Sequence, residues 1–202
     1  MYNNYIIYVI CSGFVERAVE QNRIDFVKGV VAEPKGLVWA HEGKITYDKQ
    51  VLGYWFRSPL AYNLLQELKS STLTLLSNLP IKKITTSRGS GMTLHLAFWR
   101  KSSSISYRSK DFRNPWAQWW ATKNYEVWNF LSDLLGRMYP TVKREMQKVR
   151  LPFTFGVWTA LSLNYNFSVG SHIDDRDMKD GICCVVILGD FKGGEFCFAN
   201  PV

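Results

Sequence analysis

Apolar residues recur at helical spacing in a segment that starts at Ser58-Pro59. A small polar residue followed by proline is typical of a helix start, and Pro80 ends the periodic run. Spacings of three and four residues bring apolar side chains to one face of a helix. The segment therefore predicts a helix with a leucine-rich face, formed by Leu60, Leu64, Leu65, Leu68, Leu75, Leu76 and Leu79.

A second helical segment starts in the same way, at Asn114-Pro115, and Pro140 ends it. A shorter basic helix over about 141–149 is predicted to follow. The apolar face of the long helix comprises Trp116, Trp120, Val127, Leu131, Leu134, Leu135 and Met138. We expect the aromatic side chains of this segment to pack against a sheet, and they are Trp116, Trp119, Trp120, Trp128 and Phe130.

Alternation of apolar and polar positions predicts a strand over 92–99, between the two helical segments. Residues 100–113 are polar and rich in serine, which indicates a loop. Near the N-terminus, the apolar run 5–14 is too short to span a bilayer, and we interpret it as a strand or a buried element. We therefore expect no membrane partner.

The pattern changes after Pro152. From there on, three apolar segments of strand length follow one another, at 153–167, 181–188 and 194–199. Turns rather than helical segments separate them, which predicts antiparallel strands. The predicted fold class is therefore α+β, with a helical part and some strands in residues 1–150 and a β-unit in residues 151–202. Because three strands cannot readily close a sandwich or barrel, we expect this β-unit to be incomplete.

Composition narrows the class of protein and its partners. Of 202 residues, 47% are apolar and 15% aromatic, as in a globular domain. The formal net charge of +8 favours an acidic partner, such as nucleic acid or an anionic membrane surface. The four cysteines contain no CxxC pair, which indicates buried thiols in a reducing compartment. We expect an intracellular protein, with the nucleus among the locations open to it.

His172 and Asp174 stand two residues apart in the string S171-H172-I173-D174-D175. On an extended backbone such residues point to the same side, so the imidazole and the carboxylate could bind one cation. A histidine and a carboxylate are two of the three ligands in the facial triad of non-haem Fe(II) oxygenases, which consists of two histidines and one carboxylate. The alternative is a turn, because DDRDMKDG, residues 174–181, is typical of a link between hairpin strands. Spacing alone favours the turn.

The surrounding residues carry a resemblance to a known family. The segment LSLNYNF, with Asn164, precedes the HxD pair, and GICCVVILGDF and then GGEF follow it. This order resembles the double-stranded β-helix core of the 2-oxoglutarate/Fe(II)-dependent dioxygenases, over residues 156–200. More narrowly, it is similar to the TET/JBP-like nucleic-acid oxygenases and their fungal relatives. The resemblance implies that 151–202 is the start of an incomplete jelly-roll core on which the helical part packs.

The resemblance also implies roles for individual residues. His172 and Asp174 match the first two ligands of Fe(II), and Asn164 matches a position that contacts the co-substrate 2-oxoglutarate, although Asn166 competes for that role. The implied reaction couples oxidation of a substrate C–H bond, often in a methyl group, to decarboxylation of 2-oxoglutarate to succinate.

The third ligand of the family is a later histidine, followed by a basic residue that binds the far carboxylate of 2-oxoglutarate. No histidine follows Asp174, and the other two, His41 and His95, precede the core and do not occupy the family's position. We interpret His41 as a turn residue and His95 as an exposed or hydrogen-bonded strand residue. We therefore expect a fragment of the domain, in which two ligands alone would bind iron weakly.

Basic residues gather in two clusters. The first is Arg100, Lys101, Arg108, Lys110 and Arg113, interleaved with the aromatic residues Trp99, Tyr107 and Phe112. The second is Lys143, Arg144, Lys148 and Arg150. Cations follow phosphates and aromatic rings stack on bases, so the clusters suit a groove for DNA or RNA, and a solvated face of a basic protein explains them equally well. The alternative function is a catalytically inactive basic β-domain or nucleic-acid-binding module.

Overall fold

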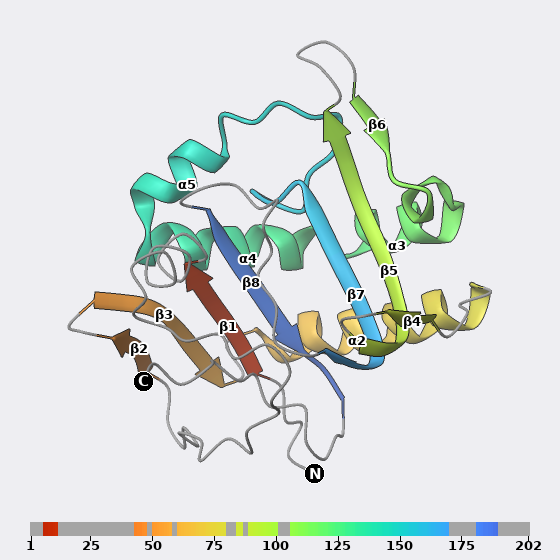
Figure 1. The fold of residues 1–202 in the computed structure, drawn as a ribbon, viewed down its shortest axis with the longest axis horizontal. Coiled ribbons are helices and arrows are strands. Elements are labelled where there is room, and N and C mark those ends of the chain that lie inside the picture. Colours follow the sequence, from red (N-terminus) through yellow and green to blue (C-terminus); the bar gives the residue numbers. More distant parts are fainter. Residues whose placement is uncertain are drawn as a thin grey trace. The chain divides into compact units, whose positions relative to one another are not determined.

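The computed structural model describes residues 6–11, 43–47, 50–57, 60–79, 84–86, 89–100, 106–169 and 181–189, with side chains at 60–79, 91–98, 107–167 and 181–189 (Figure 1). The chain divides into two compact units, one formed by Met1–Pro59 with Val169–Val202 and the other by Leu60–Ser168. Strands occur in both units, and the second unit also contains helices. This mixture of helix and sheet confirms the α+β class.

The first unit contains a four-stranded sheet with the strand order β2-β3-β1-β8. Its strands are β1 (Ile6–Cys11), β2 (Gly43–Tyr47), β3 (Gln50–Arg57) and β8 (Ile182–Ile187). β1 pairs in antiparallel fashion with both of its neighbours. Ile6 lies opposite Arg57 of β3 on one side and opposite Ile187 of β8 on the other. The apolar run near the N-terminus is therefore an inner strand of a sheet, and its isoleucines and valine suit that position.

β8 carries two adjacent cysteines, Cys183 and Cys184, and both are half-buried. Loss of solvation raises the pKa of the Cys184 thiol above its usual range, and the neighbouring Cys183 raises it further. A raised pKa keeps the thiol protonated, and the protonated form is a poor nucleophile and a poor metal ligand.

A second four-stranded sheet lies in the second unit, around the long strand β5 (Gly89–Arg100). β5 is antiparallel to β4 (Ile84–Thr86) and to β6 (Ser106–Arg108), and it also pairs with β7 (Ala160–Val169). The strand predicted over 92–99 is confirmed and extends further at both ends. The loop predicted over 100–113 was wrong for part of its length, because 106–108 pairs with β5.

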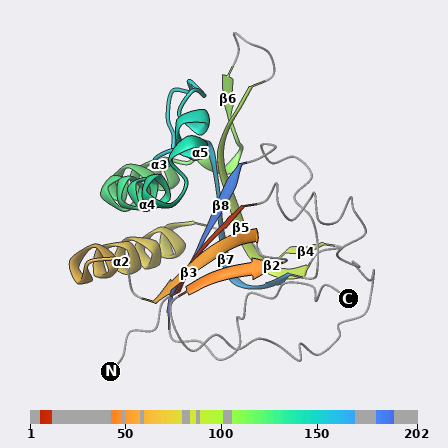
Figure 2. The ribbon, with the colours of Figure 1, turned by 90° about the vertical axis from the view of Figure 1, so that its left-hand side faces the viewer.

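Helices α2 (Tyr62–Asn78), α3 (Pro115–Lys123) and α4 (Tyr125–Met138) lie on one side of the sheet that contains β5 and β7 (Figure 2). A shorter helix, α5 (Pro140–Met146), follows α4 and confirms the predicted basic helix. α2 confirms the first predicted helix, although it begins at Tyr62, where Leu65 N–H donates to Ala61 O, and not at Pro59.

The long helix predicted between Pro115 and Pro140 is two helices, because the chain leaves helical geometry at Asn124 (φ −97°, ψ 23°). The side chain of Asn124 explains the interruption. Its Nδ2 donates to Trp120 O at 2.7 Å, so it competes with the backbone donors of the helix. The apolar spacing continues on both sides of the break, and for that reason the sequence pattern did not reveal it.

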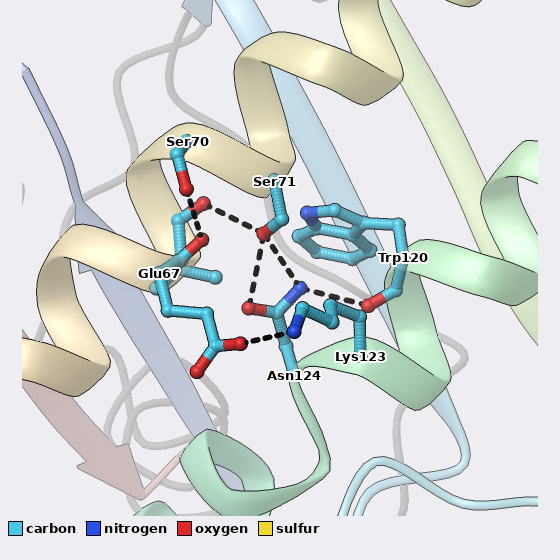
Figure 3. Close-up of polar contacts among 7 residues, drawn as sticks. Glu67, Ser70, Ser71, Trp120, Lys123 and Asn124 are labelled. Carbon is cyan, nitrogen blue, oxygen red and sulfur yellow. Dashed lines mark hydrogen bonds and ion pairs between the residues drawn. The ribbon is translucent and has the colours of Figure 1, made fainter.

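The same asparagine joins α3 to α2 through a buried contact (Figure 3). Asn124 Nδ2 donates to Ser71 Oγ at 3.0 Å, and Asn124 Oδ1 lies 3.1 Å from that hydroxyl, which can also donate to Leu68 O. Only 4% of Ser71 and 1% of Asn124 is exposed. At the surface beside them, Lys123 Nζ forms an ion pair of 2.5 Å with Glu67. The helices are thus fixed to one another by a specific polar contact as well as by leucines.

An aromatic cluster fills the space between helix α4 and the segment before β7. The Phe112 ring lies 5.6 Å from the rings of Phe98 and Phe155, and Phe155 in turn lies 5.7 Å from Trp128 on α4. Edge-to-face and tilted pairs of this kind add to the free energy of burial. Several apolar side chains of this unit are almost completely buried, among them Leu65, Leu75, Leu96, Ala117, Ala121, Val127 and Leu135.

In the part of the chain that the structure describes, the first two strands predicted after Pro152 do not pair with one another. β7 lies beside β5 in one sheet, and β8 lies beside β1 in the other. The strand predicted over 181–188 is confirmed, and the one predicted over 153–167 is confirmed only from Ala160 onward. The expected antiparallel pairing of these two neighbours in sequence was wrong. The apolar segment 194–199 lies outside the residues that the structure describes.

Candidate functional site

The predicted iron ligands His172 and Asp174 lie outside the described residues. The chain enters this segment from β7, which ends at Val169, and leaves it into β8, which begins at Ile182. The HxD pair therefore lies in sequence between β7 and β8, which belong to two different sheets.

Asn164, the predicted co-substrate residue, lies on β7 with its side chain exposed. Its Oδ1 accepts a hydrogen bond of 2.6 Å from Thr93 Oγ1 on β5. This bond fixes which way the amide points and leaves Nδ2 as a donor toward solvent. A carboxylate is the natural partner of such a donor.

Asn166, the competing candidate, is distinguished by its backbone. It adopts φ 48°, in the left-handed region that asparagine tolerates better than most residues. Its carbonyl approaches Gly91 so closely that a Cβ at that glycine would overlap it. The left-handed backbone and the close approach to Gly91 give Asn166 a structural role. The side-chain amide of Asn164, in contrast, lies on the exposed face of the strand.

His95 and Ser162 form a second polar pair beside Thr93 and Asn164. His95 Nδ1 lies 3.0 Å from Ser162 Oγ, and His95 N–H donates to Asp111 Oδ2 at 2.8 Å. Along β5 the residue number rises while that of the β7 partner falls, so the two strands are antiparallel. His95 is therefore an exposed, hydrogen-bonded strand residue, as predicted.

The β5–β7 pair consequently has two unlike faces. Leu94 and Leu96 are buried, while His95 between them is exposed, and on β7 the serine and asparagine alternate with half-buried leucines. Side chains alternate between the two faces of a strand, so one face is apolar and the other carries hydroxyl, imidazole and amide groups. We call the latter the polar face, defined by Thr93, His95, Ser162 and Asn164.

No group of three or more histidine, cysteine, aspartate or glutamate side chains that could hold a metal ion occurs in the part of the chain that the structure describes. On the polar face, His95 is the one metal-binding side chain type, and its ring is already in contact with a hydroxyl. The polar face can therefore bind an organic anion through donors, and it cannot by itself complete a metal centre.

The second basic cluster is largely neutralised. Lys143 Nζ lies 2.9 Å from Asp133, and Lys148 Nζ lies 2.6 Å from Glu145. Arg144 donates to Thr141 Oγ1 at 3.4 Å. Cations held by carboxylates in their own helical region attract phosphates less strongly, so this cluster favours the interpretation as a solvated helix face.

Of the first basic cluster, the structure describes the side chains of Arg108, Lys110 and Arg113, and one of the expected stacking residues beside them is in the core. Phe112 is 2% exposed, so the expectation that it could stack on a base was wrong. Arg108, Lys110 and Arg113 are exposed, and no described carboxylate forms an ion pair with any of them. Arg108 Nη1 instead donates to Gln118 Oε1 at 2.8 Å.

Two tryptophans predicted to pack against the sheet are exposed. Trp116 is 40% and Trp119 38% exposed, whereas Trp120 and Trp128 are buried as predicted. The buried positions of α3 are Ala117, Trp120 and Ala121. At about 100° per residue, Trp119 falls on the side opposite to that face and Trp116 falls at its margin. The alanines, small enough to lie against a neighbouring helix, were the sequence signal for this orientation.

Comparisons with known proteins give no match: no family model matches the sequence, no curated protein matches it, and no solved structure matches the fold. In the described parts of the chain, no helix has both the length and the apolar character needed to cross a membrane.

Proposed function

We propose that this chain carries the first part of an Fe(II)/2-oxoglutarate-dependent dioxygenase site, of the TET/JBP-like type, that oxidises a methyl or other C–H group, with a nucleic-acid base as the candidate substrate. The observation that carries the proposal is the HxD pair of His172 and Asp174 between two strands of different sheets. In jelly-roll folds the chain also passes between two sheets, and this common feature supports the proposal.

The proposed roles follow from the donor atoms of each side chain. His172 would supply an imidazole nitrogen and Asp174 a carboxylate oxygen, the mixed set that Fe(II) takes in facial triads. The third ligand of the family is a histidine, and no residue of this sequence is assigned to that role. The bound metal supplies the oxidation, in which O2, the substrate and 2-oxoglutarate give the oxidised product, succinate and CO2.

Asn164 would hold a carboxylate of 2-oxoglutarate through Nδ2. Because Thr93 donates to Oδ1, the amide already has its donor side turned outward, so little ordering is needed on binding. Asn164→Ala should therefore weaken 2-oxoglutarate binding while leaving Fe(II) binding unchanged. Thr93→Val should produce a smaller loss in the same direction, because it removes the orienting hydrogen bond and keeps the amide.

The proposal is tested by anaerobic titration with Fe(II), followed by 2-oxoglutarate, in the wild type and two histidine variants. His172→Ala should reduce Fe(II) affinity by at least about tenfold, since a ligand is worth at least as much as the outer groups that orient it. His95→Ala is the matched control, because it also removes an imidazole and should leave the affinity as it was. Equal binding by all three proteins would refute the iron site.

A second candidate function is a non-catalytic basic module that binds nucleic acid. It is favoured by the exposed Trp116 and Trp119 together with cations that no described carboxylate neutralises. The coding sequence downstream of Val202 distinguishes the two functions. A further histidine followed by a basic residue there supports the oxygenase, and an early stop codon supports the module.

A further inference from the structure

Helix α3 presents an aromatic pair that its own packing does not need. Trp116 and Trp119 lie with ring centroids 5.6 Å apart at 81°, an edge-to-face arrangement. In such a pair the partner ring covers one of the four ring faces, so aromatic surface remains open to solvent. Burial of an indole is a large source of favourable free energy, and leaving about two fifths of two indoles exposed is unfavourable for a free surface.

Cations border this aromatic pair. Gln118, on the same helix, accepts from Arg108 at 2.8 Å and donates to Arg113 O at 3.0 Å. The Arg113 side chain also donates to Arg108 O at 3.4 Å. These bonds tie the end of β6 and the segment before α3 to the start of the helix, so that both guanidinium groups belong to one surface.

A shallow hollow lies on helix α3 beside Trp119. It is lined by Gln118, Trp119, Thr122 and Lys123. Gln118 also accepts the hydrogen bond from Arg108, so one residue contacts both the hollow and the arginine. Lys123 contributes less charge, because Glu67 forms an ion pair with it.

The balance of charge favours an anionic partner. Arg108, Lys110 and Arg113 are exposed, and the nearest acid in sequence, Asp111, is half-buried with its carboxylate engaged by the His95 backbone N–H. A partner with both negative charge and flat rings uses the cations and the indoles together. A nucleic-acid strand has both, and its bases offer free faces only where they are unpaired.

We propose that Trp116 and Trp119, with Arg108, Lys110 and Arg113, form a binding surface for single-stranded or unpaired nucleic acid. We call it the α3 surface. The indoles stack on bases and the cations contact the phosphates that connect them. This proposal names the partner on which the proposed oxidation would act. It rests on residues of α3 and its neighbours and not on the iron ligands, so the α3 surface and the iron site can be refuted independently.

The test is fluorescence anisotropy of a labelled oligothymidine of about twelve nucleotides, a length within the usual site size of single-strand binders, without iron. Trp116→Ala and Trp119→Ala should each weaken binding by roughly fivefold or more, and Trp→Phe at either position should recover part of it. Tyr62→Ala is the matched control, because Tyr62 is a more exposed aromatic residue on another helix and should leave affinity unchanged.

Salt dependence tests the cations. Changing Arg108, Lys110 or Arg113 to Gln should weaken binding and reduce the slope of log affinity against log salt by roughly 0.7 for each phosphate that the variant no longer neutralises. Lys148→Gln is the control of equal charge change, since Lys148 is already paired with Glu145, and it should leave the slope nearly as it was.

Three results would overturn the assignment. One is oligonucleotide binding that survives removal of both indoles, and another is an equal effect of Lys148→Gln and Arg108→Gln. The third is binding of a polyglutamate peptide, and not of the oligonucleotide, with the same dependence on the tryptophans, which would make the partner an acidic protein segment. Loss of iron binding in His172→Ala with the oligonucleotide affinity intact would leave the α3 surface in place.

Discussion

Gly156 lies where the segment before β7 meets helix α4. It adopts φ +65°, and a Cβ at this position would overlap Ser132 Oγ and the carbonyl of Trp128. Ser132 cannot simply turn away, because its hydroxyl donates to Trp128 O at 2.8 Å and accepts from Val157 N–H at 3.0 Å. The absence of a side chain at Gly156 therefore allows the aromatic segment to dock on the helix.

Gly156→Ala should lower the free energy of unfolding by about 2 kcal/mol or more, because it combines a left-handed backbone with an overlap against fixed atoms. Chemical denaturation followed by tryptophan fluorescence measures this change. Gly136→Ala is the matched control: it lies inside α4, where alanine favours the helix, and the atoms near it belong to the flexible Lys143 side chain. Similar decreases in stability in the two variants would contradict the account of Gly156.

The buried contact between Ser71 and Asn124 should behave as a coupled pair. Removing Ser71 takes the hydroxyl partner from the buried Asn124 amide, which costs roughly 1–3 kcal/mol, whereas after removal of Asn124 the Ser71 hydroxyl can still donate to Leu68 O. The double variant Ser71→Ala with Asn124→Ala should therefore lose less stability than the sum of the two single variants, by about 0.5 kcal/mol or more. Strict additivity in a double-mutant cycle would show that the contact contributes nothing of its own.

At the scale of elements, β8 provides a pH-dependent test. A cysteine thiol in an unfolded chain begins to ionise near its ordinary pKa of about 8.5. In the folded protein the pKa of Cys184 is raised, so this thiol stays protonated at that pH. Alkylation of Cys184 in the native protein should thus remain slow at pH 9 and become fast on unfolding. Residue-resolved mass spectrometry measures the rate, and fast native alkylation at pH 8 would contradict the burial of this strand.

The same shift affects stability with a definite sign. A thiol that is kept protonated on folding contributes stability below the unfolded pKa, and this contribution falls as pH rises above it toward the folded pKa. Cys184→Ala should therefore flatten the decline of unfolding free energy above pH 8.5, roughly the pKa of an exposed cysteine. An unchanged decline would mean that other groups cause it.

Helices and strands were predicted correctly from the sequence where a single apolar periodicity determines the secondary structure. The leucines of α2 and the alternation in β5 each have one dominant partner surface, so local pattern and tertiary packing agree. It failed where a tertiary contact decided, as at Asn124, whose side chain interrupts the long helix, and in α3, where Trp116 and Trp119 face away from the core. The strand β6 is too short for any period to be visible.

The candidate site followed the same rule. Asn164 was assigned through the family resemblance and His95 was expected to be an exposed or hydrogen-bonded strand residue, and the structure gives both a hydrogen bond on the polar face. Their partners Thr93 and Ser162 could not be foreseen, because the pairing of β5 with β7 joins residues far apart in the sequence. The assignment of His172 and Asp174 to iron remains a prediction of the sequence.

At the scale of the whole molecule, the second unit is a continuous stretch of chain. Leu60–Ser168 contains its own sheet, its helices and the aromatic cluster around Phe155, so it has the core that independent folding requires. A fragment of residues 60–168 should unfold cooperatively on heating, as monitored by circular dichroism near the tryptophan bands. A fragment that shows helix content without such a transition would contradict the independence of this unit.

The central claim is that iron binds at the HxD pair, and iron-directed cleavage tests where it binds. Fe(II) with ascorbate and oxygen cuts a polypeptide close to the bound metal, and mass spectrometry locates the cuts. The account predicts cuts clustered around His172 and Asp174, suppressed by 2-oxoglutarate and abolished in His172→Ala. Cuts elsewhere, or an unchanged pattern in that variant, would contradict it.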